Sequence, residues 1–79
     1  MPSYLVESYV ANSSAAAEQA RGQAASLTDE QAGVRHLRTT FLPGDETILH
    51  VFEAPSLAAL RRAAGHAALQ FERIVEVVE

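Results

Sequence analysis

The chain has 79 residues, a net charge of −4 and no cysteine. This length predicts one domain, residues 1–79, without disulfides or thiolate metal sites. The sequence has no basic stripe, no apolar run of membrane-spanning length and no signal-peptide pattern at its start. We therefore expect a cytoplasmic protein that binds neither nucleic acid nor membrane. A chain this short buries only about 60–65% of its unfolded surface, so oligomerisation or a bound metal should add stability.

The first half of the sequence predicts a strand, a helix and a second strand. Residues 3–10 are β-branched and aromatic with partial alternation, which is typical of a strand. Residues 12–14 offer N-cap oxygens, and residues 15–27 favour a helix with small apolar residues on one face. Thr28 and Gln31 have capping-box spacing, so a short helical turn is expected before Gly33. Residues 34–42 then predict the second strand.

The second half predicts a hairpin, a helix and a last strand. Residues 43–45, Pro-Gly-Asp, are typical of a turn, and residues 47–53 form the third expected strand. Pro55 ends that strand, since proline cannot donate to a sheet ladder. Ser56 is the expected cap of a helix to residue 68, and residues 71–79 predict the fourth strand.

This order, βαββαβ, predicts an α+β fold of the ferredoxin-like type. Right-handed crossovers would place both helices on one face of a four-stranded antiparallel sheet. The usual spatial strand order is 4-1-3-2, with strands one and three in the middle. Both helices and one face of the sheet would then form the core.

Side chains alternate along a strand, so each strand offers two sets of residues to the two faces. The more apolar set is expected under the helices: Val6, Leu37, Phe41, Leu49, Val51, Val75 and Val77. The other set mixes large apolar residues with two carboxylates, two histidines and an arginine. Because exposed patches of this kind usually mark interfaces, we expect a second copy of the chain to cover that face.

The mixed face contains the candidate site. Across the hairpin, His36 should face Phe52 and Arg38 should face His50. Neighbouring central strands would bring Glu7 near His50, and a buried carboxylate or imidazole there needs a partner. We therefore expect Glu7 and His50 at its centre, completed by His36, Glu76 or the second subunit, with Tyr9, Arg38 and Phe52 lining a cavity.

Four segments resemble a family of small bacterial proteins that includes an actinobacterial nickel-binding protein. They are Tyr-Leu-Val-Glu at 4–7, Gly-Val at 33–34, Glu-Ala-Pro-Ser at 53–56 and Arg-Ile-Val-Glu-Val at 73–77. The resemblance covers nearly the whole chain, and it implies a dimeric ferredoxin-like α/β barrel that binds nickel or another divalent metal. Family members often have a histidine at position 38, where this chain has Arg38, so His36 and His50 would have to replace the lost ligand.

The residues leave a second function open. The chain could be a small-molecule-binding protein or an enzyme of the dimeric barrel class, such as an isomerase or cyclase. Glu7 or His50 would then act as the base, while Arg38 would hold an anionic substrate. A structural dimerisation module without a site is the third alternative.

Overall fold

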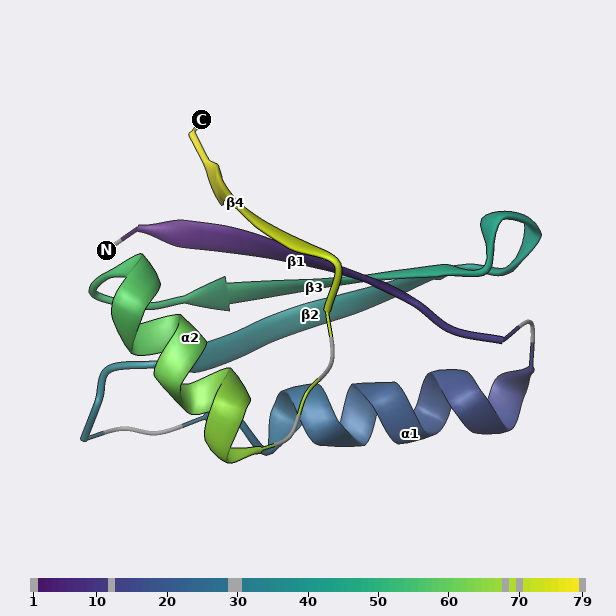
Figure 1. Ribbon diagram of the computed structural model, residues 1–79, viewed down its shortest axis with the longest axis horizontal. Coiled ribbons are helices and arrows are strands. Elements are labelled where there is room, and N and C mark those ends of the chain that lie inside the picture. Colours follow the sequence, from purple (N-terminus) through teal and green to yellow (C-terminus); the bar gives the residue numbers. More distant parts are fainter. Residues whose placement is uncertain (1, 12, 29–30, 68, 70, 79) are drawn as a thin grey trace.

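The computed structural model describes residues 2–11, 13–28, 31–67, 69 and 71–78. Its elements are β1 (Ser3–Tyr9), α1 (Ser14–Ala25), β2 (Arg35–Leu42), a 3-10 turn (Pro43–Asp45), β3 (Thr47–Glu53), α2 (Leu57–His66) and β4 (Arg73–Val77). The strands pair antiparallel in the order β2-β3-β1-β4, and both helices lie on one side of the sheet (Figure 1). The predicted ferredoxin-like fold and its strand order are confirmed.

Both helices begin at the serine caps that the sequence predicts. Ser13 Oγ accepts a hydrogen bond from the Ala16 amide at 3.0 Å, and Ser56 Oγ accepts one from the Ala59 amide at 3.1 Å. Each cap satisfies an amide that the helix cannot, which is worth about 1 kcal/mol.

No described helix is long and apolar enough to cross a membrane. The predicted capping box at Thr28 spans residues outside the described part of the chain.

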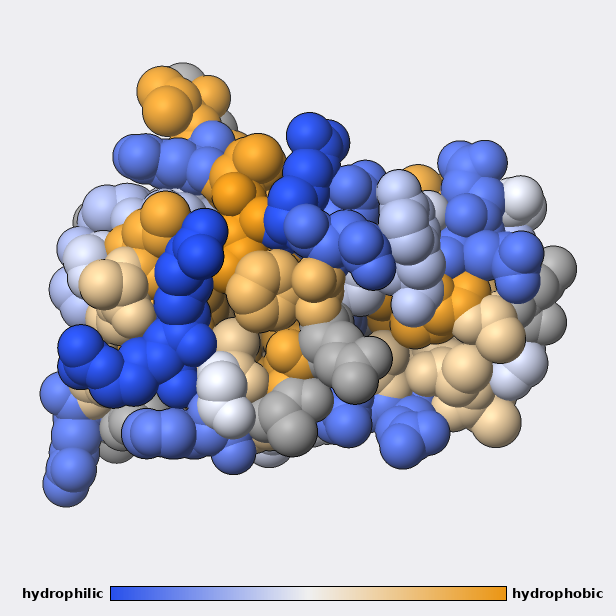
Figure 2. Space-filling model, in the orientation of Figure 1, coloured by the Kyte–Doolittle hydropathy of each residue, from blue (hydrophilic) through white to orange (hydrophobic). Residues whose placement is uncertain are grey.

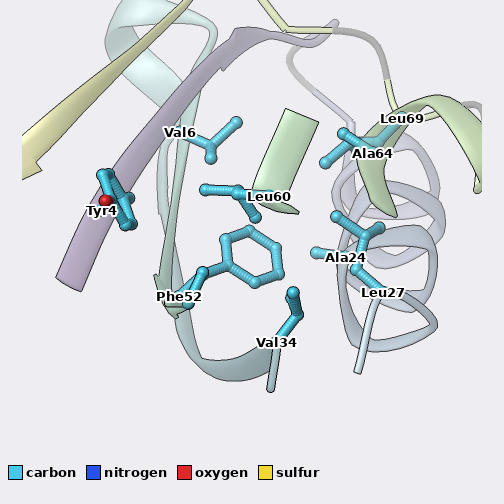
Figure 3. Close-up of a cluster of buried hydrophobic side chains, with 10 residues drawn as sticks. Tyr4, Val6, Ala24, Leu27, Val34, Phe52, Leu60, Ala64 and Leu69 are labelled. Carbon is cyan, nitrogen blue, oxygen red and sulfur yellow. The ribbon is translucent and has the colours of Figure 1, made fainter. Parts of the chain in front are cut away.

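The core lies between the helices and the sheet. Phe52 of β3 is fully buried and points toward Leu60 of α2, with Val34 and Ala24 beside it (Figure 3). The sequence pattern predicts an inner face of Ala17, Ala20, Ala24 and Leu27 for the first helix and of Leu57, Leu60, Ala64 and Ala67 for the second. Burial confirms Ala20, Ala24, Leu27, Leu60 and Ala64, while Leu57 is 37% exposed and was wrongly placed. The buried positions within α1 itself are alanines, so this helix contributes little apolar surface to the core.

The predicted sheet faces were right for β1 and wrong for β3 and β4. Tyr4 and Val6 are buried on the helix side, and they lie opposite Phe52 and His50 of β3. Leu49 and Val51 lie opposite Glu7 and Leu5, and therefore face away from the helices. The physical reason is that burying the large side chains of Ile48 and Phe52 removes more apolar surface from water than burying Leu49 and Val51. In β4, Ile74 packs against the core, while Val75 is 37% exposed.

A β-bulge in β2 moves the second half of that strand by one residue. His36 pairs with Phe52 as predicted, but the register shifts between His36 and Arg38, so Arg38 pairs with Val51. Thr39 then pairs with His50, where Arg38 was expected. Without the extra residue, His36 and Thr39 would face opposite sides of the sheet. Leu37, predicted to be under the helices, is 39% exposed.

Replacing Phe52 with Ala should lower the free energy of unfolding by about 3–5 kcal/mol, because the ring is fully buried. Val51→Ala, on the other side of the sheet, should cost clearly less. Urea denaturation would measure both losses, with Arg61→Glu on the exposed face of α2 as a control that changes stability by about 0.5 kcal/mol or less. Equal losses for Val51 and Phe52 would contradict the observed faces.

Candidate functional site

Two histidines meet on the helix side of the β2–β3 hairpin, and we refer to His36 and His50 as the histidine pair. Their ring centroids are 6.1 Å apart with an interplanar angle of 67°. The His36 ring is half-buried and packs on Phe52 with a centroid distance of 5.3 Å. His50 is completely buried. Adjacent strands therefore hold two imidazoles close together at the edge of the core.

A single hydroxyl connects the two rings. Thr39 Oγ1 lies 2.8 Å from His36 Nε2 and 2.8 Å from His50 Nδ1. The bulge makes this possible, because it turns Thr39 toward the same face as His36. The remaining nitrogen of the buried ring, His50 Nε2, has no hydrogen-bond partner among the described residues. A buried polar atom without a partner is uncommon and often has a functional reason.

Burial keeps the histidine pair uncharged. Desolvation lowers the pKa of His50 to about 4, and the nearby His36 ring lowers it as well. The pKa of His36 is also lowered, first by desolvation and then by the positive charge of Arg21, although a hydrogen bond with the Arg38 backbone opposes this. At neutral pH both rings are thus neutral imidazoles, the form that binds metals.

The structure places Glu7 and His50 on opposite faces of the sheet, so the predicted proximity of these two residues was wrong. Glu7 belongs to the opposite face of β1, and its carboxylate accepts a hydrogen bond from Arg73 Nε at 2.9 Å. His50 faces the helices instead. Strict alternation of side chains along the strands assigned Glu7 and His50 to one face. Burial of Ile48 and Phe52, however, also directs His50 toward the helices. Among the described residues, no group of three or more histidines, cysteines or carboxylates could hold a metal ion.

The other predicted site residues are also distributed over the fold. Glu76 is exposed on the edge strand β4, opposite Tyr4, and Phe52 is a fully buried core residue. Tyr9 is 65% exposed and lines a surface hollow of about 340 Å³ between the end of β1 and α1. Arg38 pairs with Val51 on the side away from the helices. The enzyme alternative with His50 as base and Arg38 as anion holder therefore lacks its geometry within one chain.

Sequence reasoning missed Thr39, the residue that joins the two rings. Strict alternation assigned Thr39 to the face opposite His36, and it offered no reason to connect the two. The signal that could have found it is chemical: a buried mid-strand histidine needs a hydrogen-bond partner. A hydroxyl on the neighbouring strand meets that need once the register shifts by one residue.

Comparison with known proteins agrees with this architecture. The structure is similar to that of SCO4226 from Streptomyces coelicolor A3(2), with a TM-score of 0.76 and 23% sequence identity. The match covers 95% of this chain and 94% of the other. At that identity the likeness shows the shared fold. No curated protein matches the sequence.

The fold is thus that of a small ferredoxin-like protein in which a buried histidine, His50, lies beside the half-buried His36. Residues 4–77 match the family described as "nickel responsive protein SCO4226-like", and the chain belongs to that family. The resemblance seen in the sequence is confirmed by this match. The description as nickel-responsive belongs to the family. The histidine pair is observed in the structure of this chain.

The buried His50 should make stability fall with acidity. In the unfolded chain its pKa returns to 6.5, so below that pH the unfolded state takes up a proton that the folded state, with a pKa of about 4, refuses. Between pH 7.5 and pH 5 this lowers the free energy of unfolding by about 2 kcal/mol, and the loss levels off below pH 4. Chemical denaturation at both pH values, without added metal, would measure it.

His50→Gln should remove most of this pH dependence, because glutamine keeps a polar group but does not titrate. His66→Gln, at an exposed position of α2, is the matched control and should leave it unchanged. Identical pH dependence in wild type and His50→Gln would contradict the assignment to His50.

Proposed function

We propose that the protein binds a divalent metal ion of the nickel type and that the histidine pair supplies its nitrogen ligands. The carrying observation is that two neutral imidazoles lie on adjacent strands with ring centroids 6.1 Å apart. Two imidazoles on one metal have centroids no more than about 6.5 Å apart, given metal–nitrogen bonds of about 2.1 Å. Imidazole suits nickel, and the description of the family as nickel-responsive supports that metal.

The donor set fits such an ion in part. Two nitrogens and the nearby Thr39 hydroxyl are too few for the four to six ligands that nickel takes, so water or groups from a second subunit would complete the shell. When bound, the ion would supply a cross-link between β2 and β3. Because an ion that binds only the folded state stabilises it by mass action, the metal concentration would set the stability of the hairpin.

Isothermal titration of the protein with Ni²⁺ and Zn²⁺ tests this proposal. Wild type should bind, and His36→Gln and His50→Gln should each weaken binding at least about tenfold, which is the cost expected for one ligand. His66→Gln is the matched control, since it removes an exposed histidine far from the hairpin in sequence. No binding by wild type, or undiminished binding by both variants of the pair, would contradict the proposal.

We further propose that two copies pair through the sheet face that points away from the helices, which we call the open face. Its centre is apolar, because Leu5 of β1 lies between Val51 of β3 and Val75 of β4. No described helix covers it, and hydrophobic side chains also gather along β4 toward the C-terminus (Figure 2). A chain of 79 residues gains needed burial by covering this face.

Two ion pairs flank the apolar centre of the open face. Arg35 is 3.1 Å from Glu53, and Arg73 is 2.9 Å from Glu7. Arg38, opposite Val51, has no ion pair among the described residues, so its guanidinium would have to reach the rim of the interface or a carboxylate of the second copy. The apolar centre makes a second copy a better occupant than a charged partner. Glu7, which the sequence predicted as a ligand, would then lie at the subunit interface.

Val51→Arg should separate the two copies, because it places a charge in the centre of the open face without touching the core. Sedimentation at micromolar concentration should show a dimer for wild type and a folded monomer for Val51→Arg, with circular dichroism as the check on folding. Arg61→Glu on α2 should stay dimeric. A stable wild-type monomer at that concentration would count against pairing.

A further inference from the structure

The Thr39 hydroxyl is shared by two rings, and it has only one hydrogen. It must therefore donate to one imidazole and accept from the other. Two directions satisfy the 2.8 Å distances to His36 Nε2 and His50 Nδ1. In the first, His50 donates to Thr39, which donates to His36. In the second, His36 Nε2–H donates to Thr39, which donates to His50 Nδ1.

The two directions differ in which nitrogen of the buried His50 ring carries the hydrogen. In the first, His50 carries its hydrogen on Nδ1, so Nε2 is a bare lone pair. In the second, Nε2 carries the hydrogen and is a buried donor. This atom has no hydrogen-bond partner among the described residues. Buried N–H donors without partners are rarer than buried acceptors without partners, which favours the first direction.

We infer that Thr39 is the positioning residue of the histidine pair: its hydroxyl accepts the Nδ1 hydrogen of His50 and donates its own to His36 Nε2, which leaves His50 Nε2 as a bare nitrogen without a hydrogen-bond partner among the described residues. In the proposed metal site, His50 would bind through Nε2, and His36 would bind through Nε2 only by exchanging the Thr39 hydrogen bond for the metal. Only this last statement rests on the proposed function. A histidine ligand usually has its other N–H held by a hydrogen bond, which fixes both the tautomer and the ring orientation. Thr39 supplies that hydrogen bond to His50.

Nitrogen-15 NMR of the histidine rings tests the direction in metal-free protein at neutral pH. In wild type, His50 should show a protonated Nδ1 and a bare Nε2, and His36 should show the same pattern. Thr39→Val keeps the side-chain shape but removes the hydroxyl, so His50 should shift toward the Nε2-protonated form that free imidazole prefers. Thr39→Ser keeps the hydroxyl and should restore the wild-type pattern.

Nickel titration of the same variants tests the positioning role. Thr39→Val should weaken nickel binding by about 10- to 100-fold, the usual effect of losing a partner of a metal-binding histidine, and Thr39→Ser should recover most of it. A protonated Nε2 in wild-type His50, or unchanged tautomers in Thr39→Val, would overturn the inference. Wild type with the expected tautomers but no nickel binding would instead overturn the proposed function and leave the hydrogen-bond direction standing.

Discussion

The need to satisfy a buried imidazole organises the β2–β3 hairpin. His50 is completely buried in the middle of β3, where an unpaired polar side chain costs about 1–3 kcal/mol. The bulge after His36 shifts β2 by one residue, so the Thr39 hydroxyl reaches His50 Nδ1. The same shift puts Thr39 within 2.8 Å of His36 Nε2. One extra residue in an edge strand thus provides a hydrogen bond for the core histidine and couples the two rings.

The element order and the helix faces could be read from the sequence because their signals are local. Ser13 and Ser56 act within their own helices, and the turn at Pro43–Asp45 closes its hairpin through neighbouring residues. The choice of faces in β3 was not local. Leu49 and Val51 form an unbroken apolar set, whereas Ile48 and Phe52 are larger but have the polar His50 between them, and only packing against α2 shows that Phe52 fills the core.

The predicted arrangement of the candidate site depended on that choice of faces, so the predicted neighbours of His50 were wrong where the face assignment was wrong. His36 was correctly placed opposite Phe52, because the register near the start of β2 precedes the bulge. Beyond the bulge, each expected partner moved by one residue, which replaced Arg38 by Thr39 beside His50. Alternation alone gives no information on an inserted residue. A buried histidine without a partner would have been the warning.

The two faces of the sheet have separate chemical roles. Imidazoles and a hydroxyl, which carry no charge at neutral pH, lie on the helix side. On the open face, Glu7 and Glu53 each have an arginine partner. Charged groups thus avoid the core, and the nitrogen donors avoid the carboxylates. A metal ion bound by the histidine pair would find no cluster of three or more histidine, cysteine or carboxylate ligands among the described residues.

The alanine face of α1 has a consequence for access to His50. This helix lies against β2 and β3, yet the residues that it buries there, Ala20 and Ala24, present little apolar surface. Methyl groups hold α1 along its length, and the buried Leu27 holds only the segment just after it, so α1 should detach from the sheet at lower free-energy cost than α2, which Leu60 holds. Brief undocking of α1 would open the interior from the helix side while the hairpin and its hydrogen bonds stay formed. The rate at which α1 undocks from the sheet would then limit how quickly an ion could reach or leave His50.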